Sequence, residues 1–152
     1  GKSMQNQNKK CPACNRYPSR ALTVDGLLVD EGKVLLIKRA ADPYEGYWAL
    51  PGGHIDYDED AMSACRRELR EETGLQAQKL QFWGLYSDPG RDPNQKITAV
   101  YLILSFEGRL QAGDDAKEAA WFAWSNLPED MAFDHREIIA GYATYLEKTH
   151  AS

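Results

Sequence analysis

The segment from Pro51 to Leu75 constrains the fold more than any other part of the chain. A turn-forming Pro51-Gly52-Gly53 leads into a run that has the pattern of an amphipathic helix between Asp58 and Thr73. Asp56 or Asp58 is suited to cap its start, and Gly74 follows its last turn, where a left-handed residue is expected. At about 100° per residue, the apolar stripe of this helix consists of Ala61, Met62, Cys65 and Leu69. The helix therefore has one face that must pack against a core.

Three glutamates on this helix are badly placed for stability. Glu68 and Glu72 fall on one edge of the apolar stripe, and Glu71 flanks them. Carboxylates at a core-facing edge are costly, and the last turns of a helix favour cations over anions. One interpretation is a solvated face on which Arg66, Arg67 and Arg70 neutralise the glutamates. The edge position favours the other interpretation, a site for a hard divalent cation with oxygen ligands.

The glycine pair before the helix adds to this hypothesis. Gly52 and Gly53 end the apolar stretch Trp48-Ala49-Leu50, and glycines let backbone carbonyls and amides approach a ligand closely. A plain turn is the alternative. Beside a helix with three carboxylates, ligand binding is the better interpretation.

The remaining pattern predicts an α/β fold in which a mixed sheet is packed between helices. Strands are expected at 21–30, 34–38, 48–50, 80–86, 97–106 and 119–124, and a last helix at 134–148, where His135 caps or packs at its start. Residues 1–20 read as an arm whose first residues resemble a cloning remnant, and residues 21–150 as one domain.

The composition limits the kinds of partner that this chain can bind. The net charge of −5 argues against a broad nucleic-acid-binding face, which needs clustered Lys and Arg, and no apolar run is long enough to span a bilayer. An odd number of cysteines favours a reducing cytoplasm over a secreted disulfide framework. Cys11 and Cys14 have the spacing of half a zinc site, which a symmetry mate would have to complete; a metal-free arm is favoured.

The residues around the helix resemble a complete Nudix box. The signature spans 23 residues, from Gly53 through Glu59 and Arg67 to the run Glu68-Leu69-Arg70-Glu71-Glu72-Thr73-Gly74-Leu75. The resemblance implies the α/β/α Nudix fold. It also implies a hydrolase that uses Mg²⁺ or Mn²⁺ to cleave the pyrophosphate bond of a nucleoside diphosphate linked to another moiety.

By the same resemblance, individual residues receive roles. Glu68 and Glu72 would be the main metal ligands, with help from Glu71 and the carbonyl of Gly52, while Glu59 and Arg67 would pair and fix the loop. The general base is either a glutamate of the box, such as Glu71 or Glu72, or an acidic residue before the strand at 119–124. Of Asp114, Asp115 and Glu118, we favour Glu118, which borders that strand.

The loop from Tyr86 to Pro93 resembles that of ADP-ribose pyrophosphatases and of Nudix domains tied to NAD metabolism, as does the helix opening at 132–136. ADP-ribose, cleaved to AMP and ribose 5-phosphate, is therefore the leading substrate, and a homodimer is expected. The candidate substrate-binding residues are Arg39, Asp88, Arg91, Lys96 and Phe133. Alternatively, Arg91 only pairs with Asp88 or Asp92. After the second proline, relatives usually have Arg and His where this chain has Asn94, Gln95 and Lys96. Alternative functions are a nucleotide-sanitising or sugar-nucleotide pyrophosphatase and a non-catalytic ADP-ribose sensor.

Overall fold

The computed structural model describes residues 9–111 and 118–150. Asp114 and Asp115 lie outside the described residues. In chain order the elements are β1 (Leu22–Leu27), β2 (Val29–Asp30), β3 (Lys33–Lys38), β4 (Trp48–Ala49), β5 (Gly52–His54), α2 (Ala61–Thr73), β6 (Gln76–Tyr86), the 3₁₀ helix η1 (Pro89–Arg91), β7 (Ile97–Glu107), β8 (Glu118–Ala123) and α3 (His135–His150).

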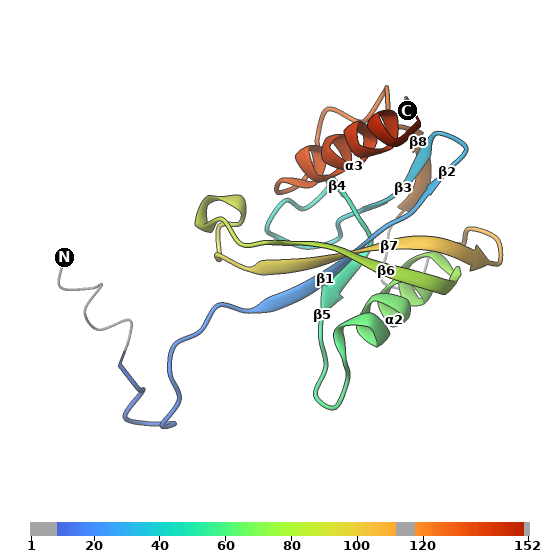
Figure 1. Ribbon diagram of the computed structural model, residues 1–152. Helices are drawn as coiled ribbons and strands as arrows, with labels where there is room; N and C mark the ends of the chain where they lie inside the picture. Colours follow the sequence, from blue (N-terminus) through green and yellow to red (C-terminus); the bar gives the residue numbers. More distant parts are fainter. Residues whose placement is uncertain (1–8, 112–117, 151–152) are drawn as a thin grey trace.

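Two small sheets form the middle layer. The first has the order β5-β1-β7-β6, in which β1 and β7 run parallel and the other pairs antiparallel. In the second, β3 lies between β2 and β4 and also pairs with β8. Figure 1 shows α2 on one side of these sheets and α3 on the other. The predicted mixed sheet between helices is confirmed.

Side chains that alternate along β3 contribute to two hydrophobic cores, one on each face of the sheet. Val34 and Leu36 of β3 point to the α3 side, where they pack in one cluster with Ile138 and Ile139. Leu35, between them, packs on the α2 side with Leu69. Because neighbouring side chains on a strand point to opposite faces, β3 serves both cores at once.

The start of α2 differs from the prediction. Its N-cap is Asp60, whose side chain accepts a hydrogen bond from Ser63 N–H at 2.8 Å, and not Asp56 or Asp58. Asp58 has a positive φ of 63° and belongs to the preceding turn. The buried face consists of Ala64, Cys65, Leu69 and Thr73, so it is rotated from the predicted stripe toward Ala64, and Met62 is half-buried. Gly74 is the left-handed C-cap, as predicted.

The described part of the N-terminal arm, residues 9–20, contains no helix or strand and leads away from the body (Figure 1). Arg20 connects its end to the β6–β7 loop by donating to the carbonyls of Gln95 and Ser87. Within residues 9–111 and 118–150, no helix is both long and apolar enough to cross a membrane.

Candidate active site

The glycine pair is part of a strand rather than only a turn. Gly52 and Gly53 pair with Asp25 and Val24 of β1. A Cβ on Gly52 would lie 2.1 Å from the carbonyl oxygen of Val24, and one on Gly53 would lie 2.5 Å from Oε1 of Glu68. Only glycine allows β5 to fit between β1 and the acidic edge of α2.

Glu68 and Glu72 lie on the edge of α2 that faces β5. Gly52 N–H donates to Oε1 of Glu72 at 3.0 Å. Burial, followed by the charge of Glu68, raises the pKa of Glu72 to about 9, and burial also raises the pKa of Glu68. A cation bound beside these two carboxylates would favour their charged forms and so lower both pKa values.

This donor set fits a hard divalent cation. Mg²⁺ and Mn²⁺ prefer carboxylate and carbonyl oxygens and usually retain several waters. Among the described residues, no three His, Cys, Asp or Glu side chains converge as a ready metal cage. The two carboxylates would therefore have to be supplemented by backbone, water or substrate oxygens.

Arg67 organises the outer side of the same helix. Its guanidinium donates to both carboxylate oxygens of Glu59, at 2.8 and 3.0 Å, so the expected pair is formed. It also reaches Glu68 at 3.0 Å, Glu71 at 3.3 Å and the carbonyl of His54 at 3.0 Å. Arg67 thus connects the loop before α2, through Glu59 and the His54 carbonyl, to Glu68 and Glu71 of the helix.

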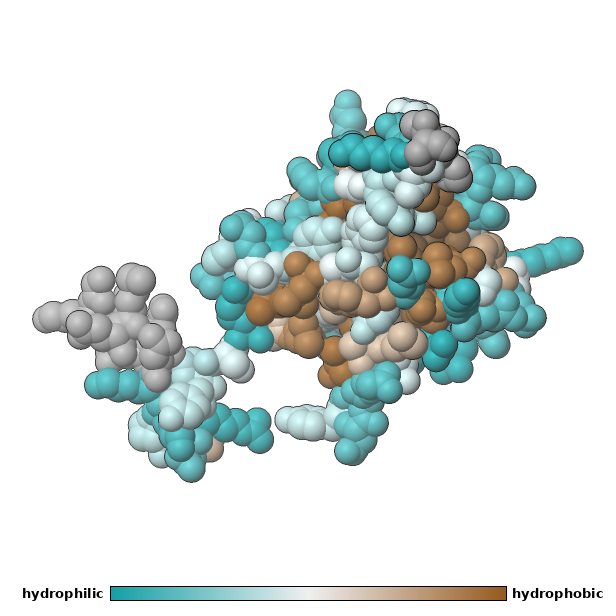
Figure 2. Space-filling model, viewed as in Figure 1, coloured by the Kyte–Doolittle hydropathy of each residue, from teal (hydrophilic) through white to brown (hydrophobic). Residues whose placement is uncertain are grey.

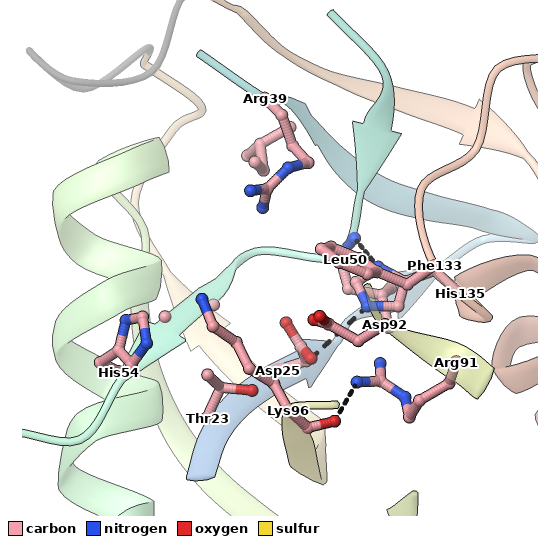
Figure 3. Close-up of a pocket in the computed structure, with 13 residues that line it drawn as sticks. Thr23, Asp25, Arg39, Leu50, His54, Arg91, Asp92, Lys96, Phe133 and His135 are labelled. Carbon is pink, nitrogen blue, oxygen red and sulfur yellow. Dashed lines mark hydrogen bonds and ion pairs between the residues drawn. The ribbon is translucent and has the colours of Figure 1, made fainter. Parts of the chain in front are cut away.

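Two adjacent cavities lie along this edge. The first, which we call the carboxylate cavity, is lined by Ile37, Lys38, Arg39, Ala40, Ala41, Gly52, Glu68, Glu71 and Glu72. The second, which we call the inner cavity, is lined by Thr23, Asp25, Ile37, Arg39, Leu50, Gly52, Gly53, His54, Arg91, Asp92, Lys96, Phe133 and His135 (Figure 3). Ile37, Arg39 and Gly52 line both cavities, so the two form one cleft. The positively charged side chain of Arg39 lies at their junction.

Arg39 and Phe133 were both predicted to bind substrate, and the structure brings them together. Arg39 Nε donates to the carbonyl of Pro43 at 2.7 Å, and its guanidinium carbon lies 4.9 Å from the centre of the Phe133 ring. The Arg91 guanidinium lies 5.6 Å from the same ring. Phe133 has a positive φ of 53°, an uncommon backbone conformation for a residue with a side chain.

Arg91 also lines the inner cavity, but its ion-pair partner is Asp134 rather than Asp88 or Asp92. Its guanidinium makes two hydrogen bonds to the carboxylate of Asp134, at 3.0 and 2.8 Å, and a third to the carbonyl of Lys96. These bonds join the β6–β7 loop to the start of α3. The Arg91 side chain is almost fully buried, so the ion pair is shielded from water.

Two other predicted residues lie outside the cleft lining. Asp88 accepts a hydrogen bond from Gly90 N–H and caps η1; the aspartate of this loop that lines the inner cavity is Asp92. Glu118 is exposed at the start of β8, 3.9 Å from Lys38 Nζ, and neither cavity is lined by it. Lys96 lies in the inner cavity, as Figure 3 shows.

Sequence reasoning missed Asp25 and assigned His135 only a structural place. Asp25 is buried in β1 and accepts a hydrogen bond from Thr98 Oγ1 at 2.5 Å. His135 Nδ1 accepts from Leu50 N–H at 3.0 Å. The available signal was a carboxylate in the middle of an otherwise apolar strand, between Val24 and Gly26.

The three cysteines are free thiols. Hydrogen bonds from the backbone of Cys14 and Ala13 lower the pKa of Cys11, whereas burial raises the pKa of Cys65 to about 12. No third zinc ligand joins Cys11 and Cys14 within the described part of the chain.

Comparison with known proteins agrees with this geometry. A family model described as NUDIX domain matches residues 19–142. The chain is 45% identical over 127 residues to an ADP-ribose pyrophosphatase of Methanocaldococcus jannaschii, covering 83% of this chain and 75% of that protein. It is 33% identical to an ADPR responsive transcriptional repressor of Acinetobacter baylyi, covering 81% of this chain and 53% of the repressor. Among solved structures, the NUDIX domain of Shewanella oneidensis NrtR complexed with ADP ribose matches with a TM-score of 0.76 and 27% identity, over 94% of this chain and 97% of that domain.

Proposed function

The chain belongs to the Nudix family, and we propose that it hydrolyses the pyrophosphate bond of ADP-ribose to give AMP and ribose 5-phosphate. The observation that carries the proposal is the single cleft in which an acidic edge, Arg39 and a polar inner cavity meet. The 45% identity to an ADP-ribose pyrophosphatase supports the choice of substrate.

We propose that Glu68, Glu72 and the carbonyl of Gly52 hold Mg²⁺ or Mn²⁺ beside the substrate. When bound, the metal neutralises charge on the pyrophosphate oxygens and acidifies a water. The family's chemistry requires oxygen ligands at this place. Burial raises the pKa of both Glu68 and Glu72, and a bound metal would displace their protons and lower both pKa values.

The chain's own residues orient the substrate and accept a proton. Arg39 lies between the two cavities, where its guanidinium can bind the pyrophosphate while one product moiety occupies the inner cavity. We propose Glu71 as the proton acceptor in preference to Glu118, because Glu71 lines the carboxylate cavity and is half exposed. Glu59 holds Arg67, and Arg67 in turn keeps Glu68 and Glu71 in place.

Turnover on a substrate panel tests the proposal. The panel comprises ADP-ribose, NADH, ADP-glucose, diadenosine polyphosphates and nucleoside triphosphates, each with Mg²⁺, with Mn²⁺ and with EDTA. We expect metal-dependent hydrolysis with the highest kcat/KM for ADP-ribose and one AMP formed per ADP-ribose consumed. A higher kcat/KM for a triphosphate would keep the Nudix chemistry and replace the substrate.

The similarity to a transcriptional repressor supports a second candidate, a domain that binds ADP-ribose without cleaving it. The chain has every fixed position of the Nudix box, which favours the enzyme over this sensor. ADP-ribose binding without turnover in any panel condition would favour the sensor.

We also propose that the enzyme works in the cytoplasm, in NAD metabolism, as a homodimer. The three free thiols are consistent with a reducing compartment, and ADP-ribose is a breakdown product of NAD. The basis for the dimer is an apolar surface on β1 and β6 that exposes Leu22, Phe82 and Leu85.

A further inference from the structure

We propose that Asp25, Asp92 and His135 form a hydroxyl-binding subsite in the inner cavity that takes the vicinal diol of a ribose. The inference rests on the proposed function, because it names the part of the substrate that this cavity recognises. All three side chains line the same cavity and are buried, at 8%, 3% and 2% exposure respectively. Figure 3 shows the two carboxylates and the imidazole around one space.

His135 supplies a hydrogen-bond donor with no partner. Its Nδ1 accepts a hydrogen bond from Leu50 N–H, so Nδ1 is unprotonated and Nε2 carries the ring hydrogen. Among the described residues, this Nε2 is the one buried side-chain nitrogen or oxygen without a hydrogen-bond partner. Native proteins rarely leave such a donor unsatisfied, which indicates a ligand or water acceptor.

Asp25 supplies an acceptor beside that donor. Its Oδ2 lies 3.5 Å from His135 Nε2, which is too long for a good hydrogen bond, and Oδ2 already accepts from Thr98. Its Oδ1 faces Gly52, at 2.3 Å from the place where a Cβ would stand. The absence of a side chain on Gly52 therefore keeps an oxygen of Asp25 accessible.

Asp92 supplies a second acceptor from another element. Its Oδ1 accepts from Asn94 N–H at 2.5 Å, which fixes the carboxylate at the end of η1. The loop that carries Asp92 is held by the bonds of Arg91 to Asp134. Asp92 and His135 thus belong to two segments joined by one buried ion pair.

Two acceptors and one donor define the chemistry of the ligand. Adjacent hydroxyls can donate to both carboxylates while one hydroxyl oxygen accepts from His135 Nε2–H. A phosphate does not fit, because two carboxylates would repel it. A cation does not fit either, because a nitrogen that carries hydrogen is no metal ligand.

The experiment compares ADP-ribose with two analogues. One lacks the 2′-hydroxyl of the adenosine ribose and the other lacks the 2-hydroxyl of the terminal ribose. We expect kcat/KM to fall by roughly tenfold or more for one of them, because a site built to bind a hydroxyl rejects a ligand that lacks it. The analogue with the lower kcat/KM identifies which ribose occupies the subsite. Equal kcat/KM, within about twofold, for all three substrates would overturn the proposal.

Two variants connect this discrimination to the residues. Asp92→Asn should raise KM for ADP-ribose by roughly tenfold, with kcat less affected. It should also reduce the difference in kcat/KM between ADP-ribose and the analogue that the wild type cleaves less efficiently. Asp88→Asn is the matched control, because Asp88 lies in the same loop but outside the cavity lining; it should retain the discrimination. If Asp92→Asn discriminates as the wild type does, Asp92 is not part of the subsite. If Asp92→Asn does not fold, the wild-type comparison still decides the proposal.

A binding measurement separates this inference from the proposed function. Calorimetry on the wild-type protein in EDTA compares AMP with 2′-deoxy-AMP, and ribose 5-phosphate with 2-deoxyribose 5-phosphate. Tighter binding of the hydroxylated member in either pair supports the subsite even if ADP-ribose is not hydrolysed. Equal affinities within both pairs contradict it even if ADP-ribose is the substrate.

Discussion

Glu72 occupies a position where an uncharged residue would be more stable. It faces Gly52 and Glu68 from the last turn of α2, where both the helix dipole and burial oppose its charge. A carboxylate belongs at such a place when a ligand requires its charge.

The first prediction concerns activity. Glu72→Gln keeps the shape of the side chain and its ability to accept from Gly52 N–H, but removes the charge. We expect kcat with Mg²⁺ to fall by about a hundredfold or more, since even residues behind the metal ligands usually cost ten- to a hundredfold. Circular dichroism should show an unchanged fold. Glu147→Gln, on the exposed side of α3, serves as the control; near-normal turnover of Glu72→Gln would refute the metal assignment.

The second prediction concerns pH. The folded-state pKa of Glu72, raised to about 9 mainly by burial, lies above its ordinary value of 4.5. The folded protein therefore keeps a proton that the unfolded chain loses. Its stabilising contribution is complete below pH 4.5 and is lost as pH rises toward 9. We expect the free energy of unfolding of the metal-free protein to decrease across this window, by at most about 1.4 kcal/mol per pH unit.

Denaturant titrations between pH 5 and pH 9 in EDTA measure this slope. Saturating Mg²⁺ should flatten it by replacing the proton, and Glu72→Gln, which cannot ionise, should flatten it as well. A slope that is the same in the variant and in the wild type would assign the pH dependence to another group.

At the scale of elements, side-chain periodicity predicted most strands and both helices. It missed β5, because Gly52 and Gly53 carry no side chains and therefore no pattern; pairing with β1 makes them a strand. The acidic edge of α2 was visible because Glu68 and Glu72 stand out against the apolar stripe. The inner cavity was not, because it depends on the ion pair of Arg91 with Asp134, 43 positions away in sequence.

A third prediction tests that ion pair as the joint between the β6–β7 loop and α3. Lysine cannot reproduce the two parallel hydrogen bonds of Arg91, so Arg91→Lys should lower the free energy of unfolding by about 1–3 kcal/mol. Because the loop forms one wall of the inner cavity, KM for ADP-ribose should rise more than kcat falls. Arg20→Lys, whose half-buried side chain bonds the same loop, should change neither quantity much.

Thermal unfolding and initial-rate kinetics on the two variants measure these effects. If Arg91→Lys lowers kcat but leaves KM unchanged, the arginine acts on the reacting groups rather than by holding the β6–β7 loop against α3.

At the scale of the whole molecule, one face of the first sheet is left partly uncovered. Leu85 lies opposite Ala99 and Phe82 opposite Tyr101, on the face that packs against α2 farther along. Together with Leu22 they form what we call the β1–β6 patch, in which the three side chains are 43–57% exposed. Figure 2 shows hydrophobic side chains over the ends of β1, β6 and β7 that extend past α2. Contiguous apolar surfaces of this kind usually mark an interface.

The β1–β6 patch leads to the fourth prediction, a homodimer that buries this surface. Charged residues at the centre of an apolar interface would remain desolvated without partners. Phe82→Asp with Leu85→Asp should therefore convert the dimer to a monomer in light scattering at micromolar concentration. Leu104→Asp is the control, because Leu104 is 44% exposed but points, like Leu102, to the opposite face of β7. The wild type should have twice the mass of one chain. A monomeric wild type, or a dimer that the double variant leaves intact, would mean that this patch does not hold two copies together.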